Sequence, residues 1–276
     1  MNTVFIVAEK EFRDGLRNRW ALAITLIFAL LALGIAYFGA AASGAVGFTS
    51  LDTTLVSLSS LAVFLIPLIA LMLAYDSIVG EEEQGTLLLL LTYPLNRLQL
   101  LLGKFLGHGA ILAVSTSVGF GLAAVVILLF SDTAAVGALV AAFSYFIVTA
   151  VLLGWVFIAF ALLLSSLAGE KSRAAGLALV VWFVFVLVFD LALLGLLVGT
   201  GGGVNADLFR YLLLLNPTDV FRLANLTGFE ATQASAGLTS IAAEHRFGPG
   251  TLLFVLMAWV IVPLALAGWH FSQRRT

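Results

Sequence analysis

Apolar residues occupy six long stretches of the chain, separated by short segments rich in glycine, serine or charge. A transmembrane helix needs about 20 predominantly apolar residues to cross the hydrocarbon core of a bilayer. The further apolar run 208–215 is far too short to cross. The pattern therefore predicts an all-α integral membrane protein with six transmembrane helices. The predicted spans are residues 20–42, 55–74, 105–130, 136–167, 174–198 and 251–269.

Composition supports this class. The chain has 276 residues, of which 62% are hydrophobic and 10% are charged, against about 25% charged in a typical soluble domain. This small number of charges cannot cover a surface that faces water. Lipid is therefore the expected solvent. The net charge of −2 gives no reason to expect a nucleic-acid partner. The absence of cysteine excludes disulfides and thiolate metal ligands.

Lysine and arginine predict the orientation, because they concentrate on the cytoplasmic side of membrane proteins. If the N-terminus is cytoplasmic, ten of the 13 lie in inner segments and only Arg210, Arg222 and Arg246 lie outside. Both termini are therefore predicted to be cytoplasmic. The whole chain, 1–276, is expected to form a single transmembrane domain.

Residues 1–19 have the pattern of an amphipathic helix that precedes the first span. An apolar face and a basic face recur at steps of three and four residues, as expected for a helix. Two interpretations remain open: a helix lying along the cytoplasmic membrane surface, or a positive flank that only sets topology. The apolar face comprises Phe5, Ala8, Phe12 and Leu16, and the basic face comprises Lys10, Arg13 and Arg17.

The inner segment 80–104 has an unusual order. Three glutamates are followed by Gly85-Thr86 and a run of five leucines, which cannot span alone and needs a surface to bury against. Pro94 is expected in the first turn of the helix that continues through Arg97 into the third span. The spacing Gly80 to Gly85 imitates a phosphate-binding loop but lacks its lysine. ATP binding by this chain is therefore not expected.

This order resembles the first cytoplasmic loop of type 2 ABC-transporter permeases. The resemblance rests on the acidic cluster, the Gly-Thr-Leu sequence, the leucine run and the Leu-Leu-Gly-Lys sequence ending at Lys104. It implies a coupling helix that docks on a separate cytoplasmic ATPase, which would carry the ATP and Mg²⁺, while this chain binds no cofactor or metal. It also implies that 1–19 is the family's connecting helix. The implied coupling residues are Glu81, Glu82, Glu83, Gly85, Thr86, Leu87, Pro94 and Arg97, and those of the connecting helix are Lys10, Phe12, Arg13 and Arg17.

The long outer segment 199–250 makes the resemblance more specific. Its sequence Leu-Leu-Leu-Leu-Asn-Pro-Thr-Asp-Val-Phe-Arg-Leu, residues 212–223, is similar to that of permeases that serve maturation of the copper centres of nitrous oxide reductase in denitrifying bacteria. The similarity implies an inner-membrane location, a second copy of the chain, a cytoplasmic ATPase and a periplasmic protein as partners. The implied periplasmic contacts are Asn216, Pro217, Asp219, Phe221 and Arg222.

Asp190 lies deep in the fifth predicted span. A carboxylate there opposes insertion by about 2.5–3.5 kcal/mol, which the surrounding leucine, valine and phenylalanine residues offset. An intramembrane acid is a candidate functional residue, and the alternative is an acid that is protonated or bonded within the bundle. Asp76, where the second span meets the cytoplasm, is expected to be a solvated or capping charge, and His108, near the inner end of the third span, is expected to anchor the chain at the membrane interface. The three histidines and three methionines are scattered, so a copper relay along this chain is not expected.

Three classes of function compete. An ABC permease explains the spans and the order of residues 80–104, and its cargo could also differ from the one the resemblance implies. A membrane enzyme would need clustered polar residues with catalytic or metal-ligand spacing, and the sequence has none. A non-ABC scaffold explains the spans but leaves the order of residues 80–104 unexplained. The sequence therefore favours the permease.

Overall fold

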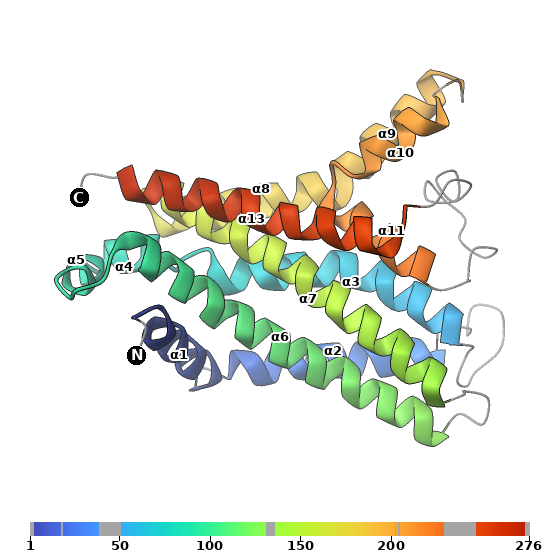
Figure 1. Cartoon of the computed structure of the whole chain (residues 1–276), viewed down its shortest axis with the longest axis horizontal. Coiled ribbons are helices and arrows are strands. Elements are labelled where there is room, and N and C mark those ends of the chain that lie inside the picture. Colours follow the sequence, from blue (N-terminus) through green and yellow to red (C-terminus); the bar gives the residue numbers. More distant parts are fainter. Residues whose placement is uncertain are drawn as a thin grey trace.

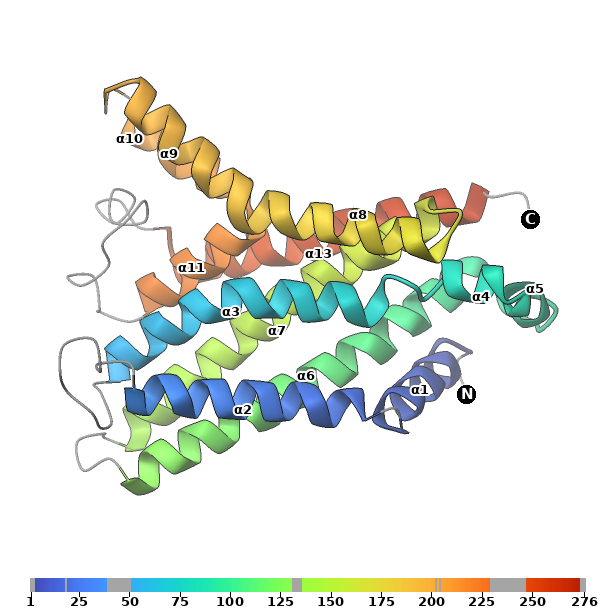
Figure 2. The ribbon, with the colours of Figure 1, turned by 180° about the vertical axis from the view of Figure 1, so that it is seen from behind.

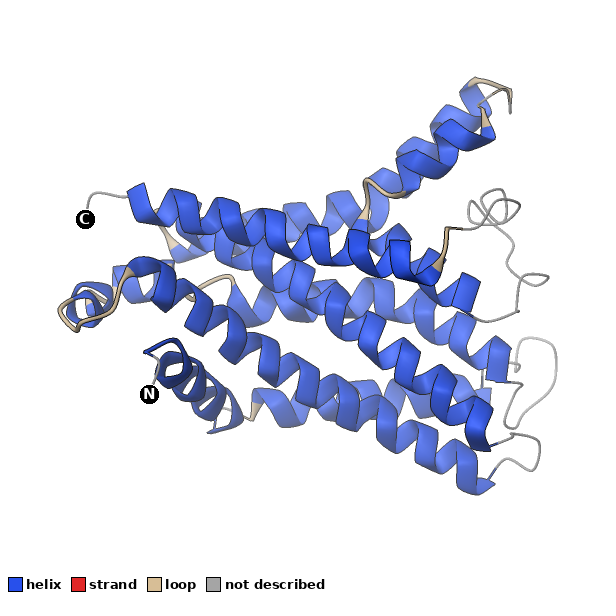
Figure 3. Ribbon diagram, viewed as in Figure 1, coloured by secondary structure: helices blue, strands red, loops and turns tan. Residues whose placement is uncertain are grey.

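The computed structural model describes residues 3–17, 19–38, 51–130, 136–201, 203, 205–228 and 247–273. Within these ranges the regular structure is entirely helical (Figure 3). The helices are α1 (Thr3–Arg17), α2 (Trp20–Phe38), α3 (Leu51–Ala74), α4 (Val79–Glu83), α5 (Thr86–Leu91), α6 (Arg97–Phe130), α7 (Val136–Leu167), α8 (Lys171–Phe183), the π-helix η2 (Val184–Val188), α9 (Phe189–Gly199), α10 (Ala206–Leu213), α11 (Pro217–Gly228) and α13 (Pro249–Gln273).

The prediction of six spans is confirmed. Six helical segments of the described residues are long and apolar enough to cross a membrane, and the fourth has the predicted bounds Val136–Leu167. The fifth is continuous through α8, η2 and α9. The predicted end of the first span, residues 39–42, lies outside the described residues.

The third span begins earlier than predicted, and its start corrects the role of Pro94. Pro94 lies in the loop before α6 and not in its first turn. Asn96 and Gln99 start the helix instead: the backbone N–H of Gln99 donates to Asn96 Oδ1 (2.7 Å), and that of Asn96 donates to Gln99 Oε1 (2.9 Å). This reciprocal pair is a capping box, which satisfies two backbone donors at the helix start.

The spans form one bundle whose two ends differ (Figures 1 and 2). Helix α7 lies at its centre, where it packs against α3, α6 and α13. One end, called here the termini end, carries α1, α4, α5 and the last turn of α13, with α5 outermost. The opposite end, the far end, carries α10 and α11. Both ends of the chain therefore lie on the same side of the bundle.

The fifth span bends at η2. A π-helix inserts one extra residue into the helical turn, which displaces the backbone hydrogen bonds and often redirects a helix. Beyond η2, α9 leaves the bundle together with α10, and this pair is called here the arm (Figures 1 and 2). The chain then returns at Pro217, a residue favoured in a first helical turn, and α11 packs against α3, α7 and α13.

Candidate functional site

Lys104 joins three elements at the termini end. It lies on α6 with its side chain 2% exposed, and its Nζ donates to Glu11 Oε1 on α1 (3.1 Å) and to Glu81 Oε1 on α4 (2.7 Å). Burying an ammonium group is costly unless it is paired and hydrogen-bonded. These three residues, called here the Lys104 junction, therefore tie the predicted connecting helix and the predicted coupling loop to the same span.

Helix α1 reaches this junction because α6 presents glycines to it. A Cβ atom at Gly107 would lie 2.9 Å from the carbonyl oxygen of Ala8, and one at Gly103 would lie 3.0 Å from that of Val4. Only glycine permits such a close approach of two helix backbones without displacing them. The predicted helix at residues 1–19 is thus confirmed as α1, and it packs on α6.

The side chains predicted for the connecting helix lie mainly on the outer faces of α1. Arg13 pairs with Glu9, and Lys10 pairs with Glu11 (3.1 Å) and Asp14 (3.6 Å). Phe12 is half-buried and Arg17 is exposed. Phe5 and Leu16 are exposed next to the packed face. A helix that also touches lipid would need such exposed apolar side chains, but their exposure does not test that contact. The membrane-surface interpretation therefore stays a prediction.

Glu11 is held in its ionised form. Burial alone would raise its pKa, but the charges of Lys104 and then of His108 and Lys10 oppose burial and lower the pKa to about 2. An opposite charge within a few ångströms favours the charged form of a carboxyl group. The Lys104 junction is therefore an ion-paired contact at neutral pH.

His108 corrects a sequence-based expectation. It was expected to anchor the chain at the membrane interface, but it is buried, with Nε2 2.8 Å from Ser77 Oγ. Nearby, Ser165 Oγ of α7 accepts hydrogen bonds from the backbone N–H groups of Ile78 (3.0 Å) and Val79 (3.1 Å). The start of α4 is thus held by α7 while its third residue is held by Lys104.

The coupling loop also contacts the start of the fifth span. Glu83 Oε1 accepts a hydrogen bond from the backbone N–H of Lys171 (2.6 Å), at the first residue of α8. Lys171 Nζ lies 2.6 Å from Asp76 Oδ2, so Asp76, expected to be a solvated or capping charge, is ion-paired. The loop between the second and third spans is therefore bonded to α6, α7 and α8.

The structure divides the predicted coupling residues into an inward and an outward group. Leu87 is buried, Glu81 bonds Lys104, and Arg97 Nη1 donates to the carbonyl oxygen of Phe271 on α13 (2.9 Å). These three residues therefore make contacts within the chain. Glu82 and Thr86 are half-buried, and Glu83, Gly85 and Pro94 are exposed.

Gly85 makes the turn that aims α5 outward. Its φ of 71° lies in the left-handed region, which glycine adopts without the steric cost that other residues meet. The following leucines divide: Leu87 is buried, whereas Leu88 and Leu89 are 58% and 65% exposed. Sequence reasoning did not single out Leu88, Leu89 or the exposed Tyr93. The signal was present in the leucine run, which is too short to span and too apolar for water.

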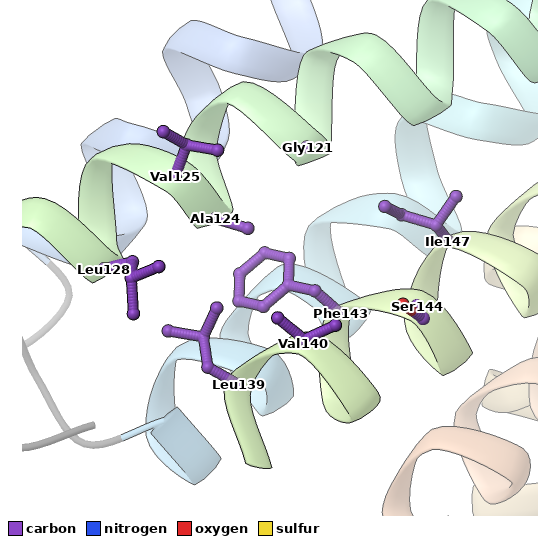
Figure 4. A pocket seen from close by; sticks show the side chains of 9 residues that line it. All are labelled: Gly121, Ala124, Val125, Leu128, Leu139, Val140, Phe143, Ser144 and Ile147. Carbon is purple, nitrogen blue, oxygen red and sulfur yellow. The ribbon is translucent and has the colours of Figure 1, made fainter. Parts of the chain in front are cut away.

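Two cavities differ in lining. One, of about 170 Å³, lies beside the Lys104 junction and is lined by charged and polar residues that include Asp76, Gln84 and His108. The other, of about 160 Å³, is an apolar groove between α6 and α7 near the far end (Figure 4). Val125 and Phe143 lie on its two walls, and Gly121 leaves it open. The polar cavity therefore lies between α1, α4 and α6, which supply Glu11, Glu81 and Lys104 to its lining.

The far end holds a second, partly buried charge cluster. Arg222 Nη1 on α11 lies 2.5 Å from Asp190 Oδ2 on α9 and 3.1 Å from Asp219 Oδ1. Asn216 Nδ2 donates to Asp219 Oδ2 (2.9 Å) and to the carbonyl oxygen of Phe185 in η2 (2.9 Å). These four residues, Asp190, Asn216, Asp219 and Arg222, are called here the Arg222 cluster. Asp190 is therefore bonded within the bundle.

This arrangement corrects the predicted periplasmic contacts. Asn216, Pro217, Asp219 and Phe221 are buried inside the chain, and Arg222 points to Asp190. The sequence Asn-Pro-Thr-Asp begins α11, which packs against α3, α7 and α13. In this arrangement the four buried side chains, those of Asn216, Pro217, Asp219 and Phe221, cannot contact another protein. Thr218 Oγ1 adds a hydrogen bond to the carbonyl oxygen of Phe185 (3.1 Å). The motif fastens the bend of the fifth span.

Asp219 behaves oppositely to Glu11. Burial and the neighbouring Asp190 charge raise the pKa of Asp219 to about 7, with Arg222 opposing both. Desolvation disfavours a charged carboxylate, and a second carboxylate adds repulsion. Among the described residues, no group of three or more His, Asp or Glu side chains is arranged to hold a metal ion. Both charge clusters are therefore sites of ion pairing.

Comparison with known proteins agrees with this architecture. The family model described as ABC-2 family transporter protein matches residues 5–275. This chain belongs to the ABC-2 transporter family. The permease is also 57% identical over 276 residues, all of both chains, to "Probable ABC transporter permease protein NosY" of Stutzerimonas stutzeri. A protein of the same name from Pseudomonas aeruginosa is 57% identical over 274 residues, 99% of each chain. The permease is thus a multi-pass membrane protein of an ABC transporter.

Proposed function

We propose that this permease transmits ATP-driven conformational change from a separate cytoplasmic ATPase across the bacterial inner membrane. Both termini, α1, α4 and α5 lie on the cytoplasmic side, as the distribution of lysine and arginine favours. The permease itself is non-catalytic and binds no cofactor, and ATP and Mg²⁺ are held by the ATPase. The observation that carries this proposal is the Lys104 junction, which links the coupling loop to α6 and α1.

The docking surface is the outward part of the coupling loop. Helix α5 is the outermost element at the termini end (Figure 1) and presents Leu88 and Leu89. Beyond the membrane such side chains meet water unless a partner covers them, and exposed apolar patches of this kind mark interaction sites. A push on α5 reaches α4 through the Gly85 turn, and α4 is bonded to α6, α7 and α8. Movement at the docking surface is therefore passed to three spans.

The process served is maturation of the copper centres of nitrous oxide reductase. The support is the full-length similarity to two proteins named NosY, together with the resemblance of residues 212–223. The partners are a NosF-like ATPase, a NosD-like periplasmic protein and a second copy of the permease. Because Asn216, Asp219 and Phe221 are internal, we place the periplasmic contact on exposed residues of the arm and the turn that follows it, namely Leu208 and Tyr211 of α10 and Leu215 just beyond α10.

The second copy is placed against the fifth span. Of the six spans this one buries the smallest share of its residues inside the chain, whereas the fourth buries the largest. Lipid also covers apolar faces, so the placement needs a direct test. The chain has no cysteine, so single cysteines at Leu179 and Leu191, both exposed, should cross-link between copies in native membranes. A cysteine at Leu129, exposed on α6, is the control that should not.

Capture of the ATPase tests the coupling role. The permease and a NosF-like ATPase are co-expressed, and the ATPase recovered with tagged permease is measured. Leu88→Glu with Leu89→Glu should reduce recovery by at least about tenfold, because desolvating two charges at a docked apolar surface costs more than 1.4 kcal/mol. Leu208→Glu with Leu215→Glu, exposed leucines of the far end, should leave recovery unchanged. Full recovery with the first pair of substitutions would refute the assignment.

A further inference from the structure

The Arg222 cluster holds two acids and one cation in a partly buried site. Asp219 is 2% exposed, and Asp190 and Arg222 are each less than a quarter exposed. The carboxyl groups of Asp190 and Asp219 lie within hydrogen-bonding reach of each other. Asp190 Oδ1 is buried and accepts no hydrogen bond from any group of the described residues. If both acids were ionised, a negative charge would remain uncompensated next to an unpaired carboxylate oxygen.

The neighbouring elements supply no second cation at this point. Helix α7 carries Tyr145, α3 carries Asp52 in its first turn, and η2 has no titratable side chain. Helix α13 carries His270 at the opposite end of the bundle. On α10, Arg210 is stacked over the rings of Tyr211 and Phe247. Among the described residues, Arg222 is the cation placed against both acids.

Two ionised carboxylates are acceptors only and cannot hydrogen-bond each other, whereas a carboxylic acid donates to a carboxylate. A pair of carboxyls in one desolvated site therefore binds a single proton far more tightly than an isolated carboxyl does. We propose that Asp190 and Asp219 form a proton-binding site, in which one shared proton and Arg222 together neutralise the two acids. The proton comes from water at the far end and sits on either acid.

The site is built into the bend of the fifth span. Asp190 belongs to the first turn of α9, and the same α11 that carries Asp219 bonds the carbonyl oxygen of Phe185 through Asn216 and Thr218. Loss of the proton places a second negative charge between α9 and α11, at the base of the arm. Binding of the proton and the position of the arm are therefore linked, because Asn216 bonds both Asp219 and the carbonyl oxygen of Phe185 in the bend.

Infrared spectroscopy of the intact permease in lipid bilayers tests the proposal directly. A protonated carboxyl group has a carbonyl stretching band that an ionised one lacks. Wild-type protein should show this band at about pH 6 and lose it by about pH 8, because the pKa of Asp219 is raised to about 7 by burial and the neighbouring carboxyl group. Asp219→Asn should abolish the band, and Asp76→Asn, which removes an ion-paired acid at the other end, should leave it. A wild-type spectrum without the band at about pH 6, or a band retained in both Asp190→Asn and Asp219→Asn, would overturn the proposal.

Thermal unfolding provides a second, independent measurement. Asparagine resembles a protonated aspartate in shape, and each single change still leaves one carboxylate to pair with Arg222. Each single variant should therefore keep its melting temperature at about pH 7 within about 3 °C of wild type. Asp190→Asn combined with Asp219→Asn leaves Arg222, which is less than a quarter exposed, without a counter-charge. This double variant should have a melting temperature about 10 °C lower than wild type. If each single variant lost as much melting temperature as the double variant, both acids would have to be ionised in the wild type. Stabilisation by sodium ions at about pH 9 in wild type, absent from both single variants, would assign the site to a metal cation instead.

Discussion

The two ends of the bundle each hold one cation between two carboxylates from different helices, yet they hold protons differently. At the termini end Lys104 bridges Glu11 and Glu81, Lys10 adds a second positive charge, and the pKa of Glu11 is lowered to about 2. At the far end Arg222 bridges Asp190 and Asp219 without such help, and the pKa of Asp219 is raised to about 7. Two similar charge clusters therefore differ in the direction in which the pKa of a buried acid is shifted, down for Glu11 and up for Asp219. The direction of the pKa shift depends on whether the positive charge close to the carboxyl group outweighs the effect of burial.

The largest effect is expected from Lys104→Met. It leaves Glu81 largely buried without its cation and Glu11 with only Lys10 as an ion-pair partner, and breaking a buried pair in this way costs about 3–5 kcal/mol. The melting temperature in detergent and the recovery of the ATPase should both fall. Lys104→Met combined with Glu11→Gln and Glu81→Gln should regain part of the melting temperature. A triple variant no more stable than the single one would show that the charges are not the cause.

Arg222→Met is the matching change at the far end, and it should depend on pH. Without Arg222 the two acids repel when ionised but can still bind protons, so the folded variant holds more protons than the unfolded chain. Stability then falls as pH rises. We expect a loss of about 3 kcal/mol near pH 8 and a clearly smaller loss near pH 5.5. Equal losses at both values would make the far end a permanent ion pair like the termini end.

Glu11→Gln should show the opposite dependence on pH. The pKa of Glu11 is lowered from 4.5 to about 2, so its contribution to stability is present above about pH 4.5 and is lost as pH falls toward 2. The shift corresponds to about 3 kcal/mol at most. Melting temperatures of wild type and variant should differ near pH 7 and converge below about pH 4. A difference that stays constant from pH 7 to pH 3 would contradict the assignment.

The smallest effect is expected from separating α1 from the junction without changing a charge. A side chain at Gly107 collides with Ala8 and Glu11 of α1, so Gly107→Val should cost about 1–3 kcal/mol and weaken the contact of Glu11 with Lys104. Gly121→Val is the matched control, because the same helix has open space at Gly121. Proteolysis of α1 in lipid nanodiscs should be faster only in Gly107→Val. Equal rates in both variants would show that α1 is held by lipid alone.

Local signals in the sequence were reliable where the surrounding medium decides the outcome. Six apolar stretches must be helices in lipid, because every backbone polar group needs a partner there, and the helix at residues 1–19 follows from its own period. The errors were of another kind. Pro94 was placed inside a helix that a capping box starts two residues later, at Asn96. His108 was placed at the interface and is buried against Ser77.

The sequence by itself determined the membrane class, the number of spans and the presence of a short apolar run between the second and third spans, since these depend on residues close together along the chain. Only the tertiary structure decided which charged residues meet: Glu11 with Lys104, 93 positions apart, and Asp190 with Arg222, 32 apart. It also turned the Asn-Pro-Thr-Asp motif inward, to fasten the π-helical bend. Such pairings depend on which helix faces are brought together and on how far water is excluded, and no local pattern carries that information.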